Sequence, residues 1–321
     1  MSSKAQAVLI FGATGLVGKY ISDEILKIAS EFRKVAVFTS PESLKTKAAA
    51  IAELKSRGAE IIIGDVTSEE DLKRAFNGFD TIVSCLGRTV LHTQIQLGQV
   101  ADKHPDVKRF FPSEYGTDIE YGPSSANEKP HQQKLKVRAQ IRELKNLEYT
   151  FIVTGPYANA DFGLFYGATP VEKEKTGTFD VKRKRAVILG TGDDKISFTT
   201  MRDTGKFVAA ALTHLPETRN RTLIVNSFTT TPRQIVAEYE KQTGGQPWNV
   251  SVTSLEELKQ LEADGWAKGD PMAGAATLKR IWTEGGTLYD HRDNAVLGLE
   301  QGVQTLADAV KDAIEWQTTF A

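Results

Sequence analysis

The sequence predicts an α/β fold, with a doubly wound parallel sheet and a smaller α+β lobe. Short apolar runs recur through the first half of the chain, a helical segment separates each run from the next, and a glycine motif follows the first run. Strands that alternate with helices in this way form parallel sheets with helices on both faces. Right-handed crossovers make such a sheet doubly wound, and its ligands bind beyond the carboxyl ends of the strands.

Each predicted strand is an apolar run bounded by turn residues or by a helical pattern. In chain order the six strands are Ala7–Phe11, Lys34–Thr39, Glu60–Ile63, Thr81–Ser84, Val107–Phe111 and Tyr149–Val153. The helices expected between them extend from the glycine motif to about 32 and over about 43–57, 68–76, 93–104 and 130–145.

After about Asn159 the pattern is less regular, and no repeat or low-complexity linker separates the two halves. We expect a main domain over 1–160 and a smaller lobe over 161–321, with a segment at about 186–230 that returns to the main domain. The elements expected in the second half are a hairpin through Gly177 between the basic clusters Lys173–Lys175 and Lys182–Arg185, strands at Thr222–Val225 and Trp248–Val252, and helices that start at Thr231 and cover Leu255–Glu262.

Composition and charge exclude several classes of protein. The 321 residues carry 40 Lys+Arg against 41 Asp+Glu, so no global basic field attracts nucleic acid or an anionic membrane. The single cysteine excludes an intrachain disulfide and a Cys-rich zinc site, and the five histidines show no metal spacing. No apolar run approaches about 18 residues and the N-terminus lacks a signal-peptide core. We therefore expect a cytoplasmic monomer or homodimer that binds a small molecule.

Three glycines, Gly12, Gly15 and Gly18, form a G-x-x-G-x-x-G motif between the first predicted strand and its helix. Gly12 permits the tight turn, Gly15 lets the backbone approach a pyrophosphate, and Gly18 allows close helix–strand packing. Free N–H groups at the helix start, together with the helix dipole, favour phosphate, so we predict a dinucleotide site. The other loop residues expected at the cofactor are Thr14, Leu16 and Val17.

The end of the second predicted strand decides between NAD and NADP, because an acidic residue there would bind the ribose 2′-hydroxyl. The strand ends instead in Thr39-Ser40, and Lys45 and Lys47 follow shortly after. Neutral hydroxyls and nearby lysines favour a 2′-phosphate, whereas Glu42 argues against it. We therefore predict NADPH as the cofactor.

Residues that follow the other strands are further candidates for contact with the dinucleotide. Asp65 lies where an adenine ring would bind, although it is equally suited to a turn. Gly87 lies along the predicted path of the cofactor ribose, and Tyr157 and Asn159 flank the predicted nicotinamide position. Cys85 is interpreted as a small buried hydrophobe, because no partnered histidine is nearby in sequence.

A resemblance to a known family rests on three segments, Gly12–Gly18, Phe110–Gly116 and Lys134–Arg138. Together they resemble the isoflavone reductase-like family of atypical short-chain dehydrogenases, which includes phenylcoumaran benzylic ether reductases, pinoresinol reductases and NmrA-like proteins. The resemblance implies a Rossmann domain, NADPH, and reduction of small aromatic or polyketide-like molecules. It also implies a lysine general acid/base, which the Lys-x-Lys-Val-Arg pattern assigns to Lys134. The arginine that is usual in the family at the end of the second strand is absent, and Thr39 takes its place.

Helical periodicity distinguishes Lys134 from its neighbour Lys136. Val137, Ile141 and Leu144 share a face with Lys134, and this apolar stripe must face the sheet. Lys136 sits about 200° around the helix and is expected in solvent. The helix start and partial desolvation would lower the pKa of Lys134 and suit it to proton transfer. Two alternatives stay open: Lys134 only hydrogen-bonds the cofactor ribose, or its side chain extends to water.

The loop after the fifth predicted strand supplies the other catalytic candidates. Ser113 can hydrogen-bond a substrate oxygen and Tyr115 can relay a proton, or both can simply shape the turn. The Tyr-x-x-x-Lys pattern of conventional short-chain dehydrogenases is absent, because Pro130 stands four residues before Lys134. His131 is interpreted as a surface residue. The aromatic residues that either line a substrate pocket or belong to the core are Phe162, Phe165 and Tyr166.

We therefore predict an NADPH-dependent reductase of a small, aromatic or secondary-metabolite substrate, with Lys134 as proton donor or acceptor. Two other functions stay open. One is a non-catalytic NADP-sensing regulator of the NmrA-like kind, and the other is an isomerase or dehydratase that uses the cofactor only structurally. A lysine on the inward face of its helix favours the enzyme over the sensor.

Overall fold

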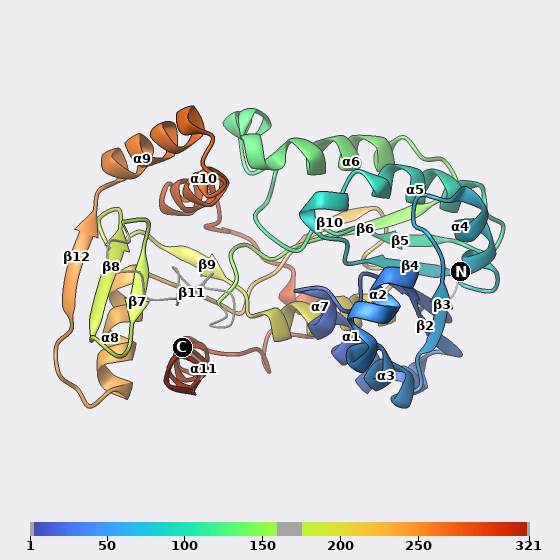
Figure 1. Cartoon of the computed structure of the whole chain (residues 1–321), viewed down its shortest axis with the longest axis horizontal. Helices are drawn as coiled ribbons and strands as arrows, with labels where there is room; N and C mark the ends of the chain where they lie inside the picture. Colours follow the sequence, from blue (N-terminus) through green and yellow to red (C-terminus); the bar gives the residue numbers. More distant parts are fainter. Residues whose placement is uncertain (1–2, 159–174, 320–321) are drawn as a thin grey trace.

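The chain forms two lobes that lie side by side (Figure 1). The computed structural model describes residues 3–158 and 175–319. The larger lobe is built on a seven-stranded sheet and the smaller lobe on a three-stranded sheet with a two-stranded one beside it. Within the described ranges, no helix is both long and apolar enough to cross a membrane.

The seven strands of the larger lobe lie in the order β10-β6-β5-β4-β1-β2-β3, and every neighbouring pair is parallel. They are β1 (Ala7–Phe11), β2 (Lys34–Thr39), β3 (Glu60–Ile63), β4 (Thr81–Ser84), β5 (Arg109–Phe111), β6 (Glu148–Val153) and β10 (Arg221–Ile224). The predicted fold class is confirmed, although β5 begins at Arg109 rather than at Val107. The strand order reverses between β1 and β4, which is where doubly wound folds bind their ligands.

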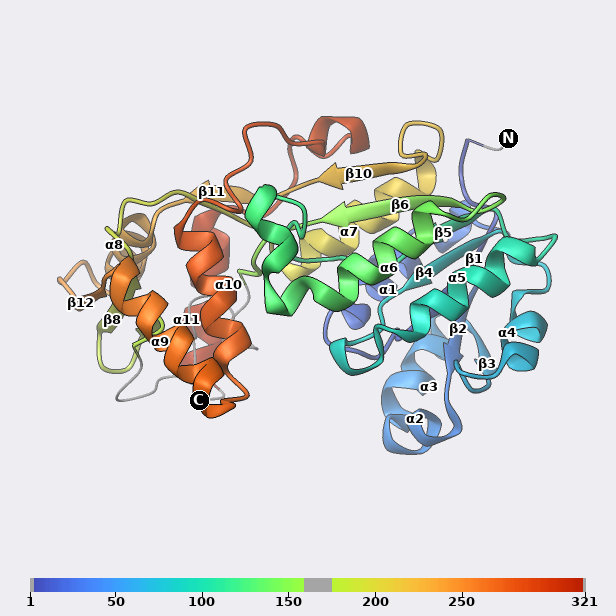
Figure 2. The ribbon, with the colours of Figure 1, turned by 90° about the horizontal axis from the view of Figure 1, so that it is seen from above.

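Helices cover both faces of this sheet (Figure 2). In chain order they are α1 (Gly18–Lys27), α2 (Pro41–Thr46), α3 (Ala48–Ser56), α4 (Glu69–Phe76), α5 (Thr93–Lys103), α6 (Gln132–Arg142) and α7 (Met201–Thr213). Successive residues of β1 point to opposite faces. Val8 and Ile10 join the core that includes α1 and α7, whereas Leu9 and Phe11 join the core beneath α4, α5 and α6.

Two predicted helices of the larger lobe differ from the structure. The helix expected over about 43–57 is two helices, α2 and α3, which meet at Lys47. Ser40 caps α2, because the Ser43 N–H donates to its hydroxyl at 3.0 Å. The first helix ends at Lys27, and a short 3-10 turn replaces its predicted last turn.

The smaller lobe packs two small sheets against helices around a separate core. Its elements are β7 (Thr178–Asp180), β8 (Arg185–Leu189), β9 (Ile196–Phe198), β11 (Phe228–Thr230), β12 (Asn249–Thr253), α8 (Pro232–Gln242), α9 (Leu255–Lys268), α10 (Ala273–Thr283) and α11 (Leu306–Thr319). β8 lies between β12 and β7, and β9 pairs with β11.

The sequence patterns of the smaller lobe are confirmed in part. The predicted capping box at the start of α8 is present, with Thr231 and Gln234 bonded to each other's backbone. The hairpin was predicted through Gly177, and this is wrong: β7 and β8 are antiparallel and their turn lies at 181–184. Lys182, Arg183 and Lys184 of the second predicted basic cluster therefore lie in the turn, and Arg185 begins β8. Trp248 precedes β12 and is buried beside Tyr239, instead of opening the strand.

The chain passes between the lobes more than once. Of the segment at about 186–230 that we expect to return, α7 and β10 lie on the larger lobe, whereas β8, β9 and β11 belong to the smaller one. The approach of α7 to α1 is close, because a Cβ on Gly205 would lie 2.4 Å from the carbonyl oxygen of Tyr20. The domain boundary at 160 stays a prediction.

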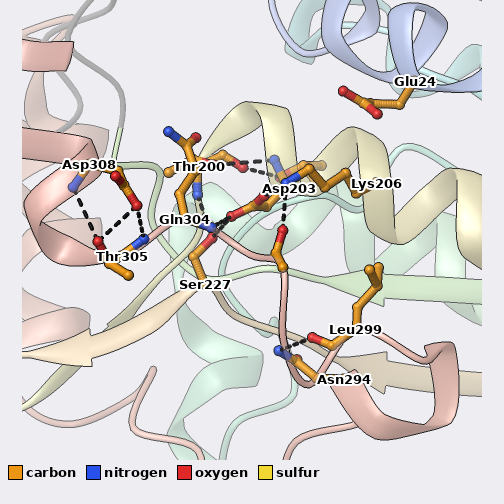
Figure 3. A network of polar contacts seen from close by, with 12 residues as sticks. Glu24, Thr200, Asp203, Lys206, Ser227, Asn294, Leu299, Gln304, Thr305 and Asp308 are labelled. Atoms are coloured by element: carbon orange, nitrogen blue, oxygen red, sulfur yellow. Dashed lines mark hydrogen bonds and ion pairs between the residues drawn. The ribbon is translucent and has the colours of Figure 1, made fainter. Parts of the chain in front are cut away.

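A buried carboxylate joins the segments that cross between the lobes (Figure 3). Asp203, in the first turn of α7, has no solvent-exposed surface. One of its carboxylate oxygens accepts from the Ser227 hydroxyl at 2.6 Å and from the Gln304 N–H at 2.7 Å, and the other pairs with Lys206 Nζ at 2.9 Å. Ser227 follows β10 and Gln304 precedes α11, so one side chain fixes three distant parts of the chain.

Replacing Asp203 with alanine is expected to lower the free energy of unfolding by about 3 kcal/mol, because it leaves a buried hydroxyl, an N–H and an ammonium without their acceptor. Urea unfolding of the wild type and the variant measures the difference. Asp308→Ala is the matched control, since this exposed carboxylate only caps α11 through Thr305. The control is expected to cost about 1 kcal/mol. Equal losses in the two variants would contradict the role given to Asp203.

Candidate active site

The glycine motif forms a tight loop between β1 and α1. Gly12 has a φ of +73°, and a Cβ there would lie 2.6 Å from the carbonyl oxygen of Cys85 at the end of β4. The N–H of Gly15 donates to the carbonyl oxygen of Gly12 at 2.9 Å. A Cβ on Gly18 would lie 2.0 Å from that same oxygen. Only glycine allows these approaches, so the roles predicted for Gly12 and Gly18 in turn and packing have a steric basis.

The amino end of α1 is open to an anion. No side chain caps the helix at Val17, and no acidic residue lies in its first turn. The N–H groups and the helix dipole therefore favour a negative group there. Thr14 is half-buried in the loop, and Leu16 is exposed. The loop thus offers the open helix start and bare backbone that suit a pyrophosphate, and the predicted residues Thr14, Leu16 and Val17 lie in it.

The end of β2 carries no carboxylate. Thr39 is buried, and the Ser40 hydroxyl is already used as the cap of α2. Lys45 is exposed and makes no hydrogen bond to the described residues of the loop, whereas Lys47 Nζ donates to the Thr14 carbonyl oxygen at 3.4 Å. Of the two lysines, Lys47 is the one that reaches the glycine loop.

Asp65 adopts the turn geometry that was expected as the alternative to a contact with an adenine ring. Its carboxylate accepts from the N–H and the hydroxyl of Thr67, both at 2.8 Å, and these bonds hold its pKa below the ordinary value. The side chain is exposed after β3. A contact with an adenine ring stays a prediction.

The loop after β5 brings the predicted serine and tyrosine close to the glycine loop. The Ser113 hydroxyl donates to the Leu86 carbonyl oxygen at 2.9 Å, which ties this loop to the one after β4. Tyr115 is buried in the core with Ala13 and Cys85, and its hydroxyl has no hydrogen-bond partner among the described residues. Burial raises the pKa of Tyr115, so its phenol stays protonated.

Lys134 lies near the start of α6 and faces inward as its spacing predicts. Val137 and Ile141, on the same face, are buried in the core beneath α6, whereas Lys136 is exposed. Lys134 Nζ donates to the backbone carbonyl oxygen of Glu114. Burial lowers the pKa of this half-buried lysine to about 8. A proton can therefore leave or join it near neutral pH.

A buried ion pair, which the sequence patterns missed, fixes the Glu114 side of this contact. Arg138 and Glu114 are almost fully buried and lie 3.0 Å apart. Arg138 also pairs with Asp118 at 3.3 Å and with Glu120 at 2.7 Å. Because Arg138 lies one turn after Lys134 on α6, it anchors the loop after β5 against the helix that carries the lysine. The sequence signal for Arg138 was its position four residues after Lys134, which places both side chains on the same side of the helix.

His131 is not the surface residue that was predicted. Only 2% of it is exposed, and its ring lies edge-on to Tyr121 with centroids 6.2 Å apart. It ends a 3-10 turn (Lys129–His131) that lies against α10 of the smaller lobe. Burial lowers the pKa of His131 to about 4, so the imidazole is neutral. No local pattern predicts a contact between this turn and the smaller lobe.

Three more of the predicted residues, Tyr157, Gly87 and Cys85, follow β6 and β4 at the same edge of the sheet. The Tyr157 hydroxyl donates to the carbonyl oxygen of Tyr115, and Gly87 is exposed after β4. Cys85 is buried, as predicted for a small hydrophobe, and burial raises its pKa. Asn159 lies outside the described residues. So do the three predicted aromatic residues, Phe162, Phe165 and Tyr166.

The described residues contain no group of three or more His, Cys, Asp and Glu that could hold a metal ion. Glu114 of this site is paired with Arg138, whereas Lys134 bonds to a carbonyl oxygen of the loop after β5 and Lys47 to one of the glycine loop after β1. An organic ligand with negative groups fits this arrangement.

Replacing Gly18 with alanine is expected to lower the free energy of unfolding by about 2 kcal/mol, because the new Cβ collides with backbone and the loop must shift. Urea unfolding measures the effect. Gly87→Ala is the control, since a Cβ there meets nothing within 4 Å and its φ of −74° suits any residue. Its effect is expected to stay within about 0.5 kcal/mol. A Gly18→Ala protein as stable as the control would contradict the steric account of the loop.

The chain is similar to several known reductases. The chain is 28% identical over 267 residues to an isoflavone reductase homolog of Solanum tuberosum, and the match covers 82% of each chain. A phenylcoumaran benzylic ether reductase of Pyrus communis is also 28% identical, with 82% of each chain covered. The structure of leucoanthocyanidin reductase from Vitis vinifera in complex with NADPH superimposes with a TM-score of 0.79 at 21% identity, over 96% of this chain and 99% of that one. The model of the NmrA-like family matches residues 4–313, and the chain belongs to that family.

Proposed function

We propose that the protein is an NADPH-dependent reductase of a small aromatic molecule. The observation that carries the proposal is the place of Lys134, a half-buried lysine whose pKa is about 8. It bonds to Glu114 in the loop after β5, next to Tyr115, which packs in one core with Ala13 of the glycine loop. The relatives named as phenylcoumaran benzylic ether reductases and the NADPH complex of the leucoanthocyanidin reductase support it.

The residues of the glycine loop fit a dinucleotide. Added Cβ atoms would fill the turn at Gly12 and the helix start at Gly18, so the loop keeps its backbone free for a pyrophosphate. The end of β2 offers hydroxyls in place of a carboxylate, and Lys47, with Lys45 nearby, would hold the 2′-phosphate. When bound, NADPH supplies a hydride at its nicotinamide ring.

In this proposal Lys134 gives a proton to an oxygen of the substrate as that oxygen gains charge. Its hydrogen bond to the Glu114 carbonyl oxygen keeps the ammonium on the site side of α6. Ser113 and Tyr115 have supporting roles. Ser113 holds two loops together and keeps lone pairs free for a substrate donor, and the protonated Tyr115 phenol is available as a relay or a donor.

The proposal extends to the rest of the chain. Residues 161–321 would form the substrate-binding lobe, which covers the carboxyl edge of the larger sheet. The protein would act in the cytoplasm as a monomer or homodimer, and light scattering of the purified protein distinguishes these two states.

Replacing Lys134 with methionine is expected to lower kcat by about 10²-fold or more, with a change of less than about threefold in the Kd for NADPH. Wild-type turnover is expected to fall as pH rises through about 8, because the lysine loses its proton there, and the variant should lack this inflection. NADPH oxidation against a panel of aromatic metabolites, measured between pH 6 and 10, checks both points.

Lys136→Met is the matched control for that experiment, since Lys136 lies on the exposed side of the same helix. It is expected to keep wild-type kcat and the wild-type pH profile. Equal turnover in the Lys134 and Lys136 variants would refute the role of Lys134. NADPH binding without turnover of any substrate, together with a tight protein partner, would favour the regulator over the enzyme.

Replacing Lys47 with methionine is expected to weaken NADPH binding about tenfold and to leave NADH binding unchanged, because only NADPH carries the 2′-phosphate. Lys45→Met tests the second predicted lysine, and a smaller loss is expected for this more distant side chain. Lys55→Met, on the exposed side of α3, is the control. Titration of cofactor fluorescence gives each Kd. If the ratio of the Kd for NADPH to the Kd for NADH were the same in all variants, the role assigned to both lysines would be wrong.

A further inference from the structure

Arg88 brings a second cation to the Lys134 site. It starts a 3-10 turn (Arg88–Val90) directly after Gly87, beyond the carboxyl end of β4. Its Nη1 donates to the carbonyl oxygen of Pro130 at 3.5 Å. Pro130 lies just before α6, so the guanidinium spans from the loop after β4 to the helix start that carries Lys134.

The charge of Arg88 acts on three other groups of the site. Burial is the main cause of the low pKa values of Lys134 and His131, and the Arg88 charge lowers both further. It also opposes the rise that burial causes in the pKa of Tyr157. Hydrogen bonds also connect the segments that carry these groups. Arg88 donates to Pro130 before α6, Lys134 donates to the carbonyl oxygen of Glu114, and Tyr157, after β6, donates to that of Tyr115 in the same loop.

The positive charge in this region has no matching carboxylate. Within residues 3–158 and 175–319, Arg88 forms no ion pair, and its one hydrogen bond goes to a neutral carbonyl. The nearby Glu114 is taken by Arg138, and Glu128 is taken by Arg280 at 2.7 Å. Two cations, Arg88 and Lys134, are thus left for a ligand.

His131 supplies an independent sign of a ligand at this place. The residue is only 2% exposed. A hydrogen bond with the Ser125 backbone opposes the fall of its pKa, and the other ring nitrogen has no hydrogen-bond partner in the described part of the chain. Buried polar groups normally find a partner. A neutral imidazole beside two cations can accept or donate a hydrogen bond to an oxygen atom of a bound molecule.

From this cluster we propose that Arg88, with Lys134 and His131 beside it, forms a subsite for an anionic oxygen group, and that the group is the carboxylate of an aromatic substrate. The inference rests on the proposed reductase function and narrows its substrate to aromatic acids. A guanidinium binds a carboxylate through paired, charge-assisted hydrogen bonds. The other source of such a group is a phosphate of the dinucleotide. The neighbours of Arg88 favour the substrate, because the open end of α1 and Lys47 lie at the glycine loop instead.

Calorimetric titration of benzoate and of benzyl alcohol into the protein saturated with NADP⁺ tests the subsite. The two probes differ in the carboxylate and share the ring. Wild-type protein is expected to bind benzoate about tenfold more tightly than benzyl alcohol. Arg88→Met is expected to remove this preference and to leave benzyl alcohol binding unchanged, whereas Arg88→Lys keeps part of it.

Arg33→Met is the matched control. Arg33 is also exposed, and it also donates to a single carbonyl oxygen, that of Gly78 at 2.9 Å, but it lies before β2 at the opposite edge of the sheet. This variant is expected to keep the preference for benzoate. Urea unfolding midpoints equal to wild type in all variants show that each protein is folded.

NADPH titration of the same proteins separates the outcomes. The subsite proposal expects an unchanged Kd for NADPH in Arg88→Met. A tenfold weaker NADPH complex would assign Arg88 to the phosphates and overturn the substrate carboxylate. A benzoate preference that is absent in wild type, or intact in Arg88→Met, would also overturn it. If wild-type protein bound no NADPH at all, the reductase function itself would fail.

Discussion

The carboxyl edge of the larger sheet depends on the close approach of three backbone segments at Gly12. The turn after β1, the end of β4 and the start of α1 meet where no side chain fits, as the contacts of Gly12 and Gly18 show. This crowding fixes where α1 begins and which way its N–H groups point. It also leaves a surface of bare backbone between β1 and β4, at the position where the strand order reverses. The loops that carry the candidate chemistry are arranged around this point.

The proton transfer proposed for Lys134 depends on how carboxylates are distributed between the two cations Lys134 and Arg138 of α6. Arg138 takes the buried Glu114 and two further acidic residues, so its charge is neutralised inside the protein. Lys134, one turn earlier, is left with a backbone carbonyl as its acceptor. Desolvation is therefore only weakly compensated at Lys134, which is why its pKa falls toward neutrality. Two cations on one helix thus have different roles because of their partners.

Local patterns were enough to predict the frame of the larger lobe. Each buried parallel strand is a continuous apolar run, and a glycine loop must follow β1, so strands, fold class and the inward side of α6 could be obtained from spacing alone. The break between α2 and α3 at Lys47 could not be predicted, because the sequence pattern of this segment is helical throughout. Contacts between residues far apart in the chain could not be predicted from local patterns either. His131 is buried beside Tyr121 in a turn that lies against α10, and the contact of Arg88 with Pro130 joins positions far apart in the chain.

The return of α7 and β10 to the larger lobe has a consequence for how this protein can be divided. A fragment that ended near residue 160 would leave β6 as an open sheet edge and would uncover the apolar side of α1, including Ile21 and Ile25. A fragment that began there would carry β10 without β6, its neighbour in the sheet, and α7 without α1 to pack against. The two lobes are therefore not separable modules. Exchange of substrate preference between relatives would have to proceed by grafting loops and helices onto an intact chain, rather than by swapping halves.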